Sequence, residues 1–493
     1  MINHRIVLRA LGSLLYIESL LLALCMLVGV FYQETAFWTF GIPTLLSATL
    51  GYGFTRFGKN AENRLSRRDG YLVVSLTWAV FSIVGMMPFL ISGATDRPSV
   101  AFFEAMSGFT TTGSTAFADV DGLTHSLLFW RSISHWLGGM GIVFFTLAIL
   151  PGMGNGDQKL FAAEATGLKL GKLHPRIHTT ARWLWGFYLL LTGLCFGALL
   201  LAGMGLFDAI NHALSTVATG GFSTHTASIG WFNSPTIELT ESLFMFLASI
   251  NFALLYLILF RGKVRIFWQD SELRGFIVVL GLAIVCMTVI LTPSDWLTAA
   301  GGPLSTLPDS LRRAVFNCIS VMSTTGFTTE NYMDWHPNGW VIISLIGICG
   351  ACAGSTSGGI KMIRLILGAK VFFTEFLRAL HPRAVIPIRI NGHIVESHVV
   401  RTVFAFFTAY CIILVLSICI ICGYGYSLLD SFGMAISSLS NIGPTIGHQL
   451  SPLDSWGTLP DGILWLNSFL MLCGRLEIFS LLLPFIPAFW QEN

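Results

Sequence analysis

Long apolar stretches alternate with short polar ones along the whole chain. Each long stretch holds enough apolar residues to cross roughly 30 Å of hydrocarbon as a helix of about 20 residues. The pattern predicts ten spans, at residues 10–32, 37–55, 71–93, 126–150, 183–204, 236–260, 275–292, 340–375, 400–422 and 462–489. We therefore expect an all-α polytopic membrane protein, in which little chain is left over for a soluble domain.

Four further apolar stretches are too short to cross a membrane. They occupy residues 98–116, 206–224, 309–329 and 428–447, and each ends in a cluster rich in small and polar residues. A helix that enters the membrane part-way and returns fits this pattern, because irregular backbone at that depth is tolerated only inside protein or beside a water-filled cavity. The sequence therefore predicts four re-entrant helices, each between two spans.

The four clusters align as a repeat. They read Thr110-Thr111-Thr112-Gly113-Ser114, Val217-Ala218-Thr219-Gly220-Gly221, Ser323-Thr324-Thr325-Gly326-Phe327 and Ser440-Asn441-Ile442-Gly443-Pro444. Their aligned glycines lie 107, 106 and 117 residues apart, and a near-constant period indicates repeated structural units.

The repeat predicts four pseudo-symmetric units of span, re-entrant pore helix and span around one central pore. An extra pair of transmembrane helices precedes them. The expected boundaries are 1–68 for this pair, then 69–160, 161–270, 271–390 and 391–493 for the pore repeats.

Glycine after small polar residues suits a filter made of backbone oxygens. A cation that sheds its water needs a ring of carbonyl oxygens, and glycine permits the dihedrals and the close approach that such a ring requires. The C-terminal ends of the re-entrant helices add partial negative charge. The predicted filter residues are Thr111, Thr112, Gly113, Ala218, Thr219, Gly220, Thr324, Thr325, Gly326, Asn441, Ile442 and Gly443. The last two of each segment are expected to hold the ion.

Charge predicts the orientation of the spans. Hydrophobic residues make up 54% of the chain and charged residues 11%, against about 25% charged in soluble domains. Of the 28 Lys and Arg residues, 23 fall in alternate connecting segments, at 1–9, 56–68, 157–182, 261–274 and 361–401. The positive-inside rule places these segments, and with them both termini, in the cytoplasm.

A glycine-rich run, residues 350–359, interrupts the eighth span. It does not match a phosphate-binding loop, because Ile360 intervenes before Lys361. A simple glycine kink and a mobile plug below the filter both remain possible from these residues. The residues of this candidate gate are Gly350, Gly354, Ser355, Thr356, Ser357, Gly358, Gly359 and Lys361.

Arg475 lies inside the last predicted span. A charge at that depth is costly and is expected to face the bundle interior with a partner. Glu477 is two residues away and does not share its helix face. Arg475 therefore either forms a structural ion pair or contacts loop carbonyls elsewhere, or it acts as an electrostatic barrier to cations. Glu104, Asp208, Asn211 and His212, inside re-entrant helices, are expected to serve packing and helix starts rather than ion contact.

In combination, these motifs resemble the Trk/Ktr/HKT superfamily of K⁺ transport proteins, and within it the bacterial TrkH/TrkG membrane subunits. The resemblance covers essentially the whole chain, including the run 350–361 and Gly474-Arg475-Leu476-Glu477. It implies K⁺ uptake across the bacterial inner membrane, since all four filter positions are glycine and a serine at the first goes with Na⁺ transport in some plant relatives. It also implies that 350–359 is the gate and that Arg475 faces the pore.

The same resemblance implies partners. It suggests a homodimer and a cytosolic NAD- or ATP-binding regulatory subunit of the TrkA kind, while the basic segments suit lipid head groups. K⁺ is then the transported ion, and neither an organic cofactor nor nucleic acid is expected.

Two other classes of function compete with this one. A symporter coupled to H⁺ or Na⁺ would show inverted repeats and broken helices in paired positions, whereas here one orientation repeats and a single broken span is predicted. A Na⁺-permeable relative is a variant of the main hypothesis. A membrane enzyme would need convergent His, Asp, Glu or Cys side chains, which the sparse intramembrane charges do not provide, so we expect no enzymatic activity.

Overall fold

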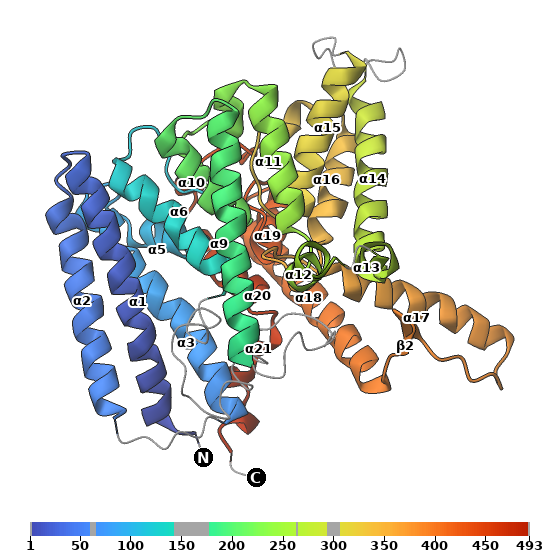
Figure 1. Ribbon diagram of the computed structural model, residues 1–493. Helices are drawn as coiled ribbons and strands as arrows, with labels where there is room; N and C mark the ends of the chain where they lie inside the picture. Colours follow the sequence, from blue (N-terminus) through green and yellow to red (C-terminus); the bar gives the residue numbers. More distant parts are fainter. Residues whose placement is uncertain (1, 60–65, 142–176, 263–264, 293–305, 492–493) are drawn as a thin grey trace.

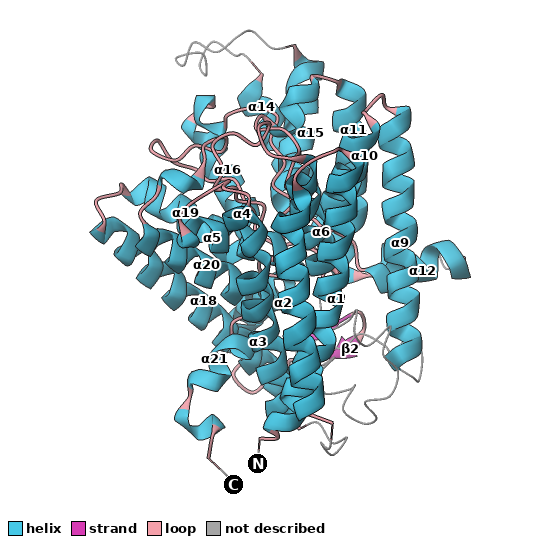
Figure 2. Ribbon diagram, turned by 90° about the vertical axis from the view of Figure 1, so that its left-hand side faces the viewer, coloured by secondary structure: helices cyan, strands magenta, loops and turns pink. Residues whose placement is uncertain are grey.

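The computed structural model describes residues 2–59, 66–141, 177–262, 265–292 and 306–491. Within these ranges the chain is built of helices, apart from one small antiparallel hairpin (Figures 1 and 2). Its strands β1 (Arg389–Ile390) and β2 (His393–Ile394) pair across an Asn-Gly turn, the sequence that favours tight hairpins. The two chain ends lie at the same end of the molecule (Figure 1).

A pair of long helices precedes the repeats. Helices α1 (His4–Phe31) and α2 (Ala36–Phe57) lie side by side on the outside of the bundle (Figures 1 and 2). They approach closely where Gly12 meets Gly51, since a Cβ on Gly12 would lie 2.8 Å from the Gly51 oxygen. Small residues at such a crossing are typical of helix packing in membranes.

The same three-helix unit then recurs four times. In each, a long helix leads to a short re-entrant helix, and a second short helix follows. The units are α3 (Arg67–Gly85) with α4 (Met87–Ile91), α5 (Pro98–Phe109) and α6 (His125–Gly139); α9 (Ile177–Leu201), α10 (Leu206–Val217) and α11 (Pro235–Ala248); α14 (Ser271–Leu291), α15 (Leu307–Met322) and α16 (Pro337–Ile348); and α18 (Ser397–Gly423), α19 (Leu428–Ser440) and α20 (Asp461–Arg475).

Within the described residues, three predicted spans are broken rather than one. The span expected at 236–260 bends by 100° between α11 and α12 (Phe252–Arg261), and the last bends by 115° after α20. In the eighth, the loop 349–361 separates α16 from α17 (Met362–Leu380). The expectation of a single broken span was therefore wrong, because α11 and α20 also end against this loop, at Ala248 and Arg475. Residues 142–150 of the fourth predicted span, and 157–176 of a basic segment, lie outside the described residues.

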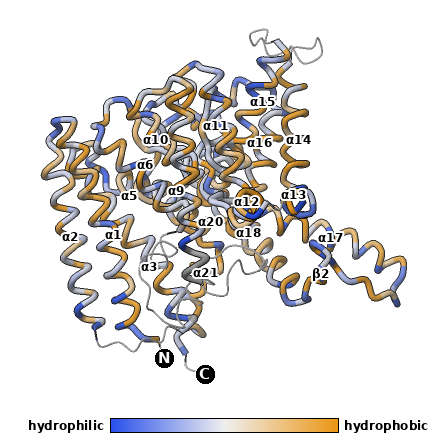
Figure 3. Tube along the Cα trace, viewed as in Figure 1, coloured by the Kyte–Doolittle hydropathy of each residue, from blue (hydrophilic) through white to orange (hydrophobic). Residues whose placement is uncertain are grey.

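These breaks are one reason why fewer helices cross by themselves than the ten predicted spans; another is that α2, predicted to span at 37–55, is not among the helices that are long and apolar enough. Five described helices are long and apolar enough to span a membrane, or up to seven if each bent pair is one span. Apolar residues cover the outer helices (Figure 3), and large side chains such as Leu45 and Leu201 are exposed there. The chain is thus a multi-pass membrane protein whose apolar surface suits lipid.

The remaining elements are short or lie beside the bundle. Helix α17 extends away from the body of the molecule (Figure 1). The others are α13 (Arg265–Gln269), α21 (Phe479–Leu482), and the 3₁₀ turns Ser228–Phe232, Tyr332–Asp334, Trp456–Thr458, Leu483–Phe485 and Pro487–Phe489.

Candidate functional site

The four re-entrant helices end in one shared backbone conformation. Shortly after each helix, a residue with left-handed φ is followed, two positions later, by a glycine with left-handed φ. These pairs are Thr111 (54°) and Gly113 (81°), Thr219 (52°) and Gly221 (85°), Thr324 (58°) and Gly326 (80°), and Asn441 (55°) and Gly443 (105°). The conformation is costly for the non-glycine members, so its fourfold recurrence marks a constrained site.

This conformation corrects the alignment of the second segment. Gly221, not Gly220, has the left-handed φ of the other three glycines. The hydrogen bonds agree, because Gly220 N–H donates to Ser215 O at 2.8 Å, as Thr112 N–H donates to Ser107 O at 3.0 Å. The second segment therefore runs Thr219-Gly220-Gly221, and Ala218 is the cap residue of α10.

A sequence signal for this register exists and was missed. A serine stands six residues before each left-handed glycine, at Ser107, Ser215, Ser320 and Ser437. Alignment on the first Gly of the Gly220-Gly221 pair puts a leucine at that position. The serines would have identified the second glycine.

The four segments close into a ring. A Cβ on Gly113 would overlap Gly220 O, one on Gly221 would overlap Thr325 O, and one on Gly326 would overlap Ile442 O. A Cβ on Gly443 would lie 2.7 Å from Thr112 O, which completes the circle. Each glycine thus meets a carbonyl of the next segment, and any side chain at the glycine position would displace that carbonyl. Backbone oxygens of all four repeats gather around one axis.

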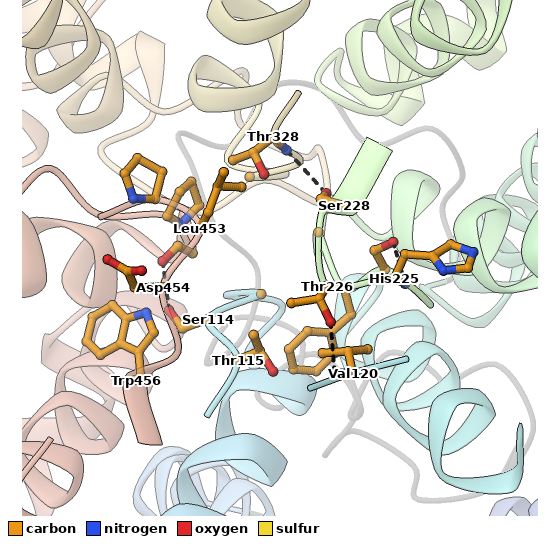
Figure 4. A pocket seen from close by; sticks show the side chains of 18 of the residues that line it. Ser114, Thr115, Val120, His225, Thr226, Ser228, Thr328, Leu453, Asp454 and Trp456 are labelled. Carbon is orange, nitrogen blue, oxygen red and sulfur yellow. Dashed lines mark hydrogen bonds between the residues drawn. The ribbon is translucent and has the colours of Figure 1, made fainter. Parts of the chain in front are cut away.

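The same four glycines line one pocket, which forms the mouth of the ring (Figure 4). Its wall takes side chains from several repeats. Those labelled in Figure 4 include Ser114, Thr115, His225, Thr226, Ser228, Thr328, Asp454 and Trp456. Hydrogen bonds join neighbouring repeats around it: Trp456 N–H donates to Thr115 O at 3.0 Å, and Thr328 N–H to Ser228 Oγ at 3.3 Å.

His225 connects two acidic groups at this mouth. Its Nδ1 lies 2.6 Å from Asp121 Oδ1, its Nε2 lies 3.7 Å from Asp208 Oδ1, and its ring stacks on Trp231. Burial lowers the pKa of His225, but the two carboxylates outweigh burial and raise the pKa above its ordinary value. His225 therefore stays protonated to a higher pH in the folded protein than in the unfolded chain.

We expect His225 to make thermal stability depend on pH. Because the pKa of His225 is higher in the folded protein than in the unfolded chain, its contribution to folding stability is fully present below the unfolded pKa of about 6.5. This contribution is lost as the pH rises through the folded-state pKa. In detergent, the melting temperature of the wild type should exceed that of His225→Gln by about 1–2 °C at pH 6, since a partly exposed ion pair contributes under about 1 kcal/mol. The difference should shrink by pH 9; a constant difference would contradict this prediction.

Polar side chains of three re-entrant helices hydrogen-bond the segment that follows the glycine. The residue nine positions before the glycine is Glu104, His212, Asn317 or Met434. Glu104 accepts a hydrogen bond from Ala116 N–H at 2.7 Å, His212 Nε2 lies 3.0 Å from Ser223 Oγ, and Asn317 Nδ2 lies 3.4 Å from Thr329 Oγ1. The sequence analysis predicted packing roles for Glu104 and His212, and both side chains contact these segments; Glu104 also pairs with Arg131 on α6.

The interrupting loop lies directly below the ring. Thr356 Oγ1 donates to Val217 O at 3.1 Å, and Gly358 N–H donates to Thr324 Oγ1 at 2.6 Å. A Cβ on Gly358 would lie 2.5 Å from Ser440 O. The loop therefore touches the ends of α10, α15 and α19, which a simple helix kink would not do.

The loop is held closed at its base. Gly350 N–H donates to Ile360 O at 2.9 Å, and Met362 N–H donates to Ala351 O at 3.1 Å. Lys361 is buried and donates from Nζ to the oxygens of Ser357. The loop is thus an ordered loop whose two ends are joined by hydrogen bonds.

A buried carboxylate on α14 adds a second clamp to this loop. Glu272 Oε1 accepts hydrogen bonds from Ala353 N–H at 2.6 Å and from Ile363 N–H at 3.1 Å. It therefore ties the two arms of the loop to the first turn of a spanning helix.

Arg475 contacts carbonyl oxygens at this level. It donates to Thr356 O at 2.9 Å in the loop, and to Gly139 O at 2.8 Å and Gly138 O at the end of α6. Glu477 pairs with Arg364 instead. The guanidinium thus joins the loop to the first repeat, with its positive charge beneath the ring.

Comparison with known proteins identifies the family. The family model described as TrkH, cation transport protein, matches residues 43–492. This chain belongs to the TrkH family of cation transport proteins. The family is one of transporters rather than of enzymes.

Relatives in the TrkH family cover the whole chain. The Trk system potassium uptake protein TrkH of Salmonella typhimurium is 36% identical over 99% of this chain and 100% of its own. TrkG of Escherichia coli is 35% identical over 99% of both. The crystal structure of the potassium transporter TrkH from Vibrio parahaemolyticus superimposes with a TM-score of 0.88 at 35% identity, covering 99% of this chain and 100% of that one.

Proposed function

We propose that this protein carries K⁺ into the cell through a filter formed by the backbone oxygens of its four re-entrant segments. The observation that carries this proposal is the ring, in which the left-handed glycine of each segment meets a carbonyl of the next. Such a ring replaces the hydration shell of a cation. The proposed ion-binding residues are Thr112, Gly113, Gly220, Gly221, Thr325, Gly326, Ile442 and Gly443. The relatives are potassium uptake proteins by name.

The loop at 350–359 then acts as a gate. It lies below the ring, is hydrogen-bonded to the second and third re-entrant segments and to Arg475, and packs closely against the fourth segment at Ser440. Glycines at both ends allow it to rearrange. Arg475 supports the closed position and also places a positive charge on the path of the ion.

Assembly and regulation follow from the family. We propose a homodimer in the bacterial inner membrane, with both termini cytoplasmic, that is regulated by a cytosolic NAD- or ATP-binding subunit of the TrkA kind. The name Trk system in the relatives supports a multi-component assembly, and the basic segments suit anionic lipid head groups.

Flux measurements test the transport function. The purified protein in liposomes should admit K⁺ in preference to Na⁺ under a K⁺ gradient alone, whereas empty liposomes should admit neither. Expression should also restore growth at low K⁺ to a bacterium that lacks K⁺ uptake. Equal flux of the two ions would overturn the selectivity, and flux that requires a proton or Na⁺ gradient would favour the coupled symporter. The measurement with and without a proton or Na⁺ gradient is necessary because three described spans are broken, and paired broken helices are typical of coupled transporters.

A further inference from the structure

One guanidinium bridges two neighbouring segments of the ring. Arg131, on α6, donates from its terminal nitrogens to Ser223 O at 2.8 Å and to Thr115 Oγ1 at 3.1 Å. Thr115 stands two residues after Gly113, and Ser223 two residues after Gly221. Arg131 therefore connects equivalent positions of the first and second segments, just outside the two glycines.

A buried carboxylate fixes this guanidinium in place. Glu104, on α5, accepts a hydrogen bond from Arg131 Nε at 2.7 Å, and the two side chains are 0% and 2% exposed. Glu104 also accepts from Thr115 Oγ1 at 3.1 Å. The carboxylate neutralises a positive charge that lines the mouth and would otherwise repel cations.

Two side chains of α6 hold the residue after Gly221 between them. The Arg131 guanidinium lies over the Phe222 ring at 4.1 Å from its centre, and the His135 ring stacks on Phe222 with centres 4.1 Å apart. Helix α6 belongs to the first repeat, yet it positions the ring segment of the second repeat.

At two other boundaries the described links between the ring segments themselves are neutral, although ion pairs of the flanking helices join the same repeats, Arg97 with Asp461 and Arg312 with Glu238. The first and fourth segments are joined by Ser114 Oγ donating to Gly443 O at 3.0 Å, and the second and third by Gly230 N–H donating to Thr328 O at 3.2 Å. These links are neutral. A fully buried ion pair adds little net stability, because loss of hydration opposes the attraction. The role of the Arg131–Glu104 pair therefore lies in the groups that it positions, Thr115 and Ser223.

We propose that Arg131, held by Glu104, is a positioning residue of the filter that sets the spacing of the first and second segments and thereby the preference for K⁺ over Na⁺. The inference rests on the proposed transport function. The planar fork of arginine is needed, since a lysine ammonium is a single point charge and does not span the same three oxygens in that geometry.

The test compares ion preference in liposomes for Arg131→Lys and Thr115→Val. Arg131→Lys keeps the charge but loses the fork, and we expect its K⁺/Na⁺ permeability ratio to fall by about tenfold, because selectivity depends on the arrangement of the carbonyls. Thr115→Val removes one shared hydroxyl with little change of shape and should lower the ratio by a smaller factor. Arg312→Lys is the matched control and should keep the wild-type ratio. Arg312 forms an ion pair with Glu238, with 3.1 Å between the nitrogen and the oxygen, and this pair does not contact the ring.

The ratio separates positioning from a purely structural role. A variant that merely folds poorly lowers both fluxes and leaves their ratio unchanged. If Arg131→Lys yields no folded protein, Thr115→Val decides the question. A wild-type ratio in the folded variants would overturn the inference while leaving the transport function intact, whereas a wild-type protein without K⁺ preference would overturn the transport function itself.

Discussion

Gly326→Ala is expected to remove the preference for K⁺ and to lower K⁺ uptake by about 10- to 100-fold, since a non-glycine residue at left-handed φ costs about 1–3 kcal/mol before any steric clash is counted. Gly326 has φ of 80°, and an added Cβ would overlap the Ile442 carbonyl oxygen. The overlap is with backbone, so it is relieved only by moving a carbonyl of the ring.

The measurement is the K⁺/Na⁺ permeability ratio in liposomes, together with growth at low K⁺. Gly339→Ala serves as the control, because Gly339 lies in α16 of the same repeat and its added Cβ would meet the nearest atom at an ordinary 3.5 Å. Gly221→Ala, Gly113→Ser and Gly443→Ser should behave like Gly326→Ala. A wild-type ratio in Gly326→Ala would show that these carbonyls do not select the ion.

Arg475→Gln is expected to raise K⁺ flux by about tenfold or more, because a hydrogen bond from a charged donor is worth about 1.5–3 kcal/mol. The change removes the positive charge beneath the ring. It also weakens the attachment of Thr356 O, which holds the loop against α6. Both effects open the path.

Arg475→Lys separates these two effects. If charge alone forms the barrier, the lysine variant should keep the low wild-type flux; if the fork that ties the loop matters more, its flux should rise as well. Arg97→Gln is the control, because Arg97 pairs with Asp461 at the opposite end of the same helix α20. Unchanged flux in Arg475→Gln would argue against both the barrier and the tether.

Much of the architecture was predictable because it depends on local composition. The thickness of a bilayer sets how many apolar residues a crossing helix needs, so stretches such as 428–447 were recognisable as too short. The family and the all-helical fold are confirmed by the comparisons and the structure. The four re-entrant helices begin within two residues of the predicted segments and end seven residues before them, because the glycine-bearing clusters that follow are not helical.

The register of the second segment was predictable in principle and was misassigned. Gly220 and Gly221 are adjacent, and composition does not distinguish them. The left-handed φ of Gly221 and the hydrogen bond from Gly220 N–H to Ser215 O distinguish the two glycines. The internal repeat of serine six residues upstream carried the same information.

What the sequence alone determined is the set of apolar lengths, the re-entrant helices and the glycine-bearing repeat, since each follows from residues close together in the chain. Only the tertiary structure decided which glycine joins the ring, where the 236–260 and 462–489 spans break, and which groups Arg475 and Arg131 contact. Those features depend on main-chain oxygens and carboxylates from distant segments, such as Thr356 and Glu104. Apolar run length and composition carry no information about such long-range partners, because they arise from how the four repeats pack around a common axis.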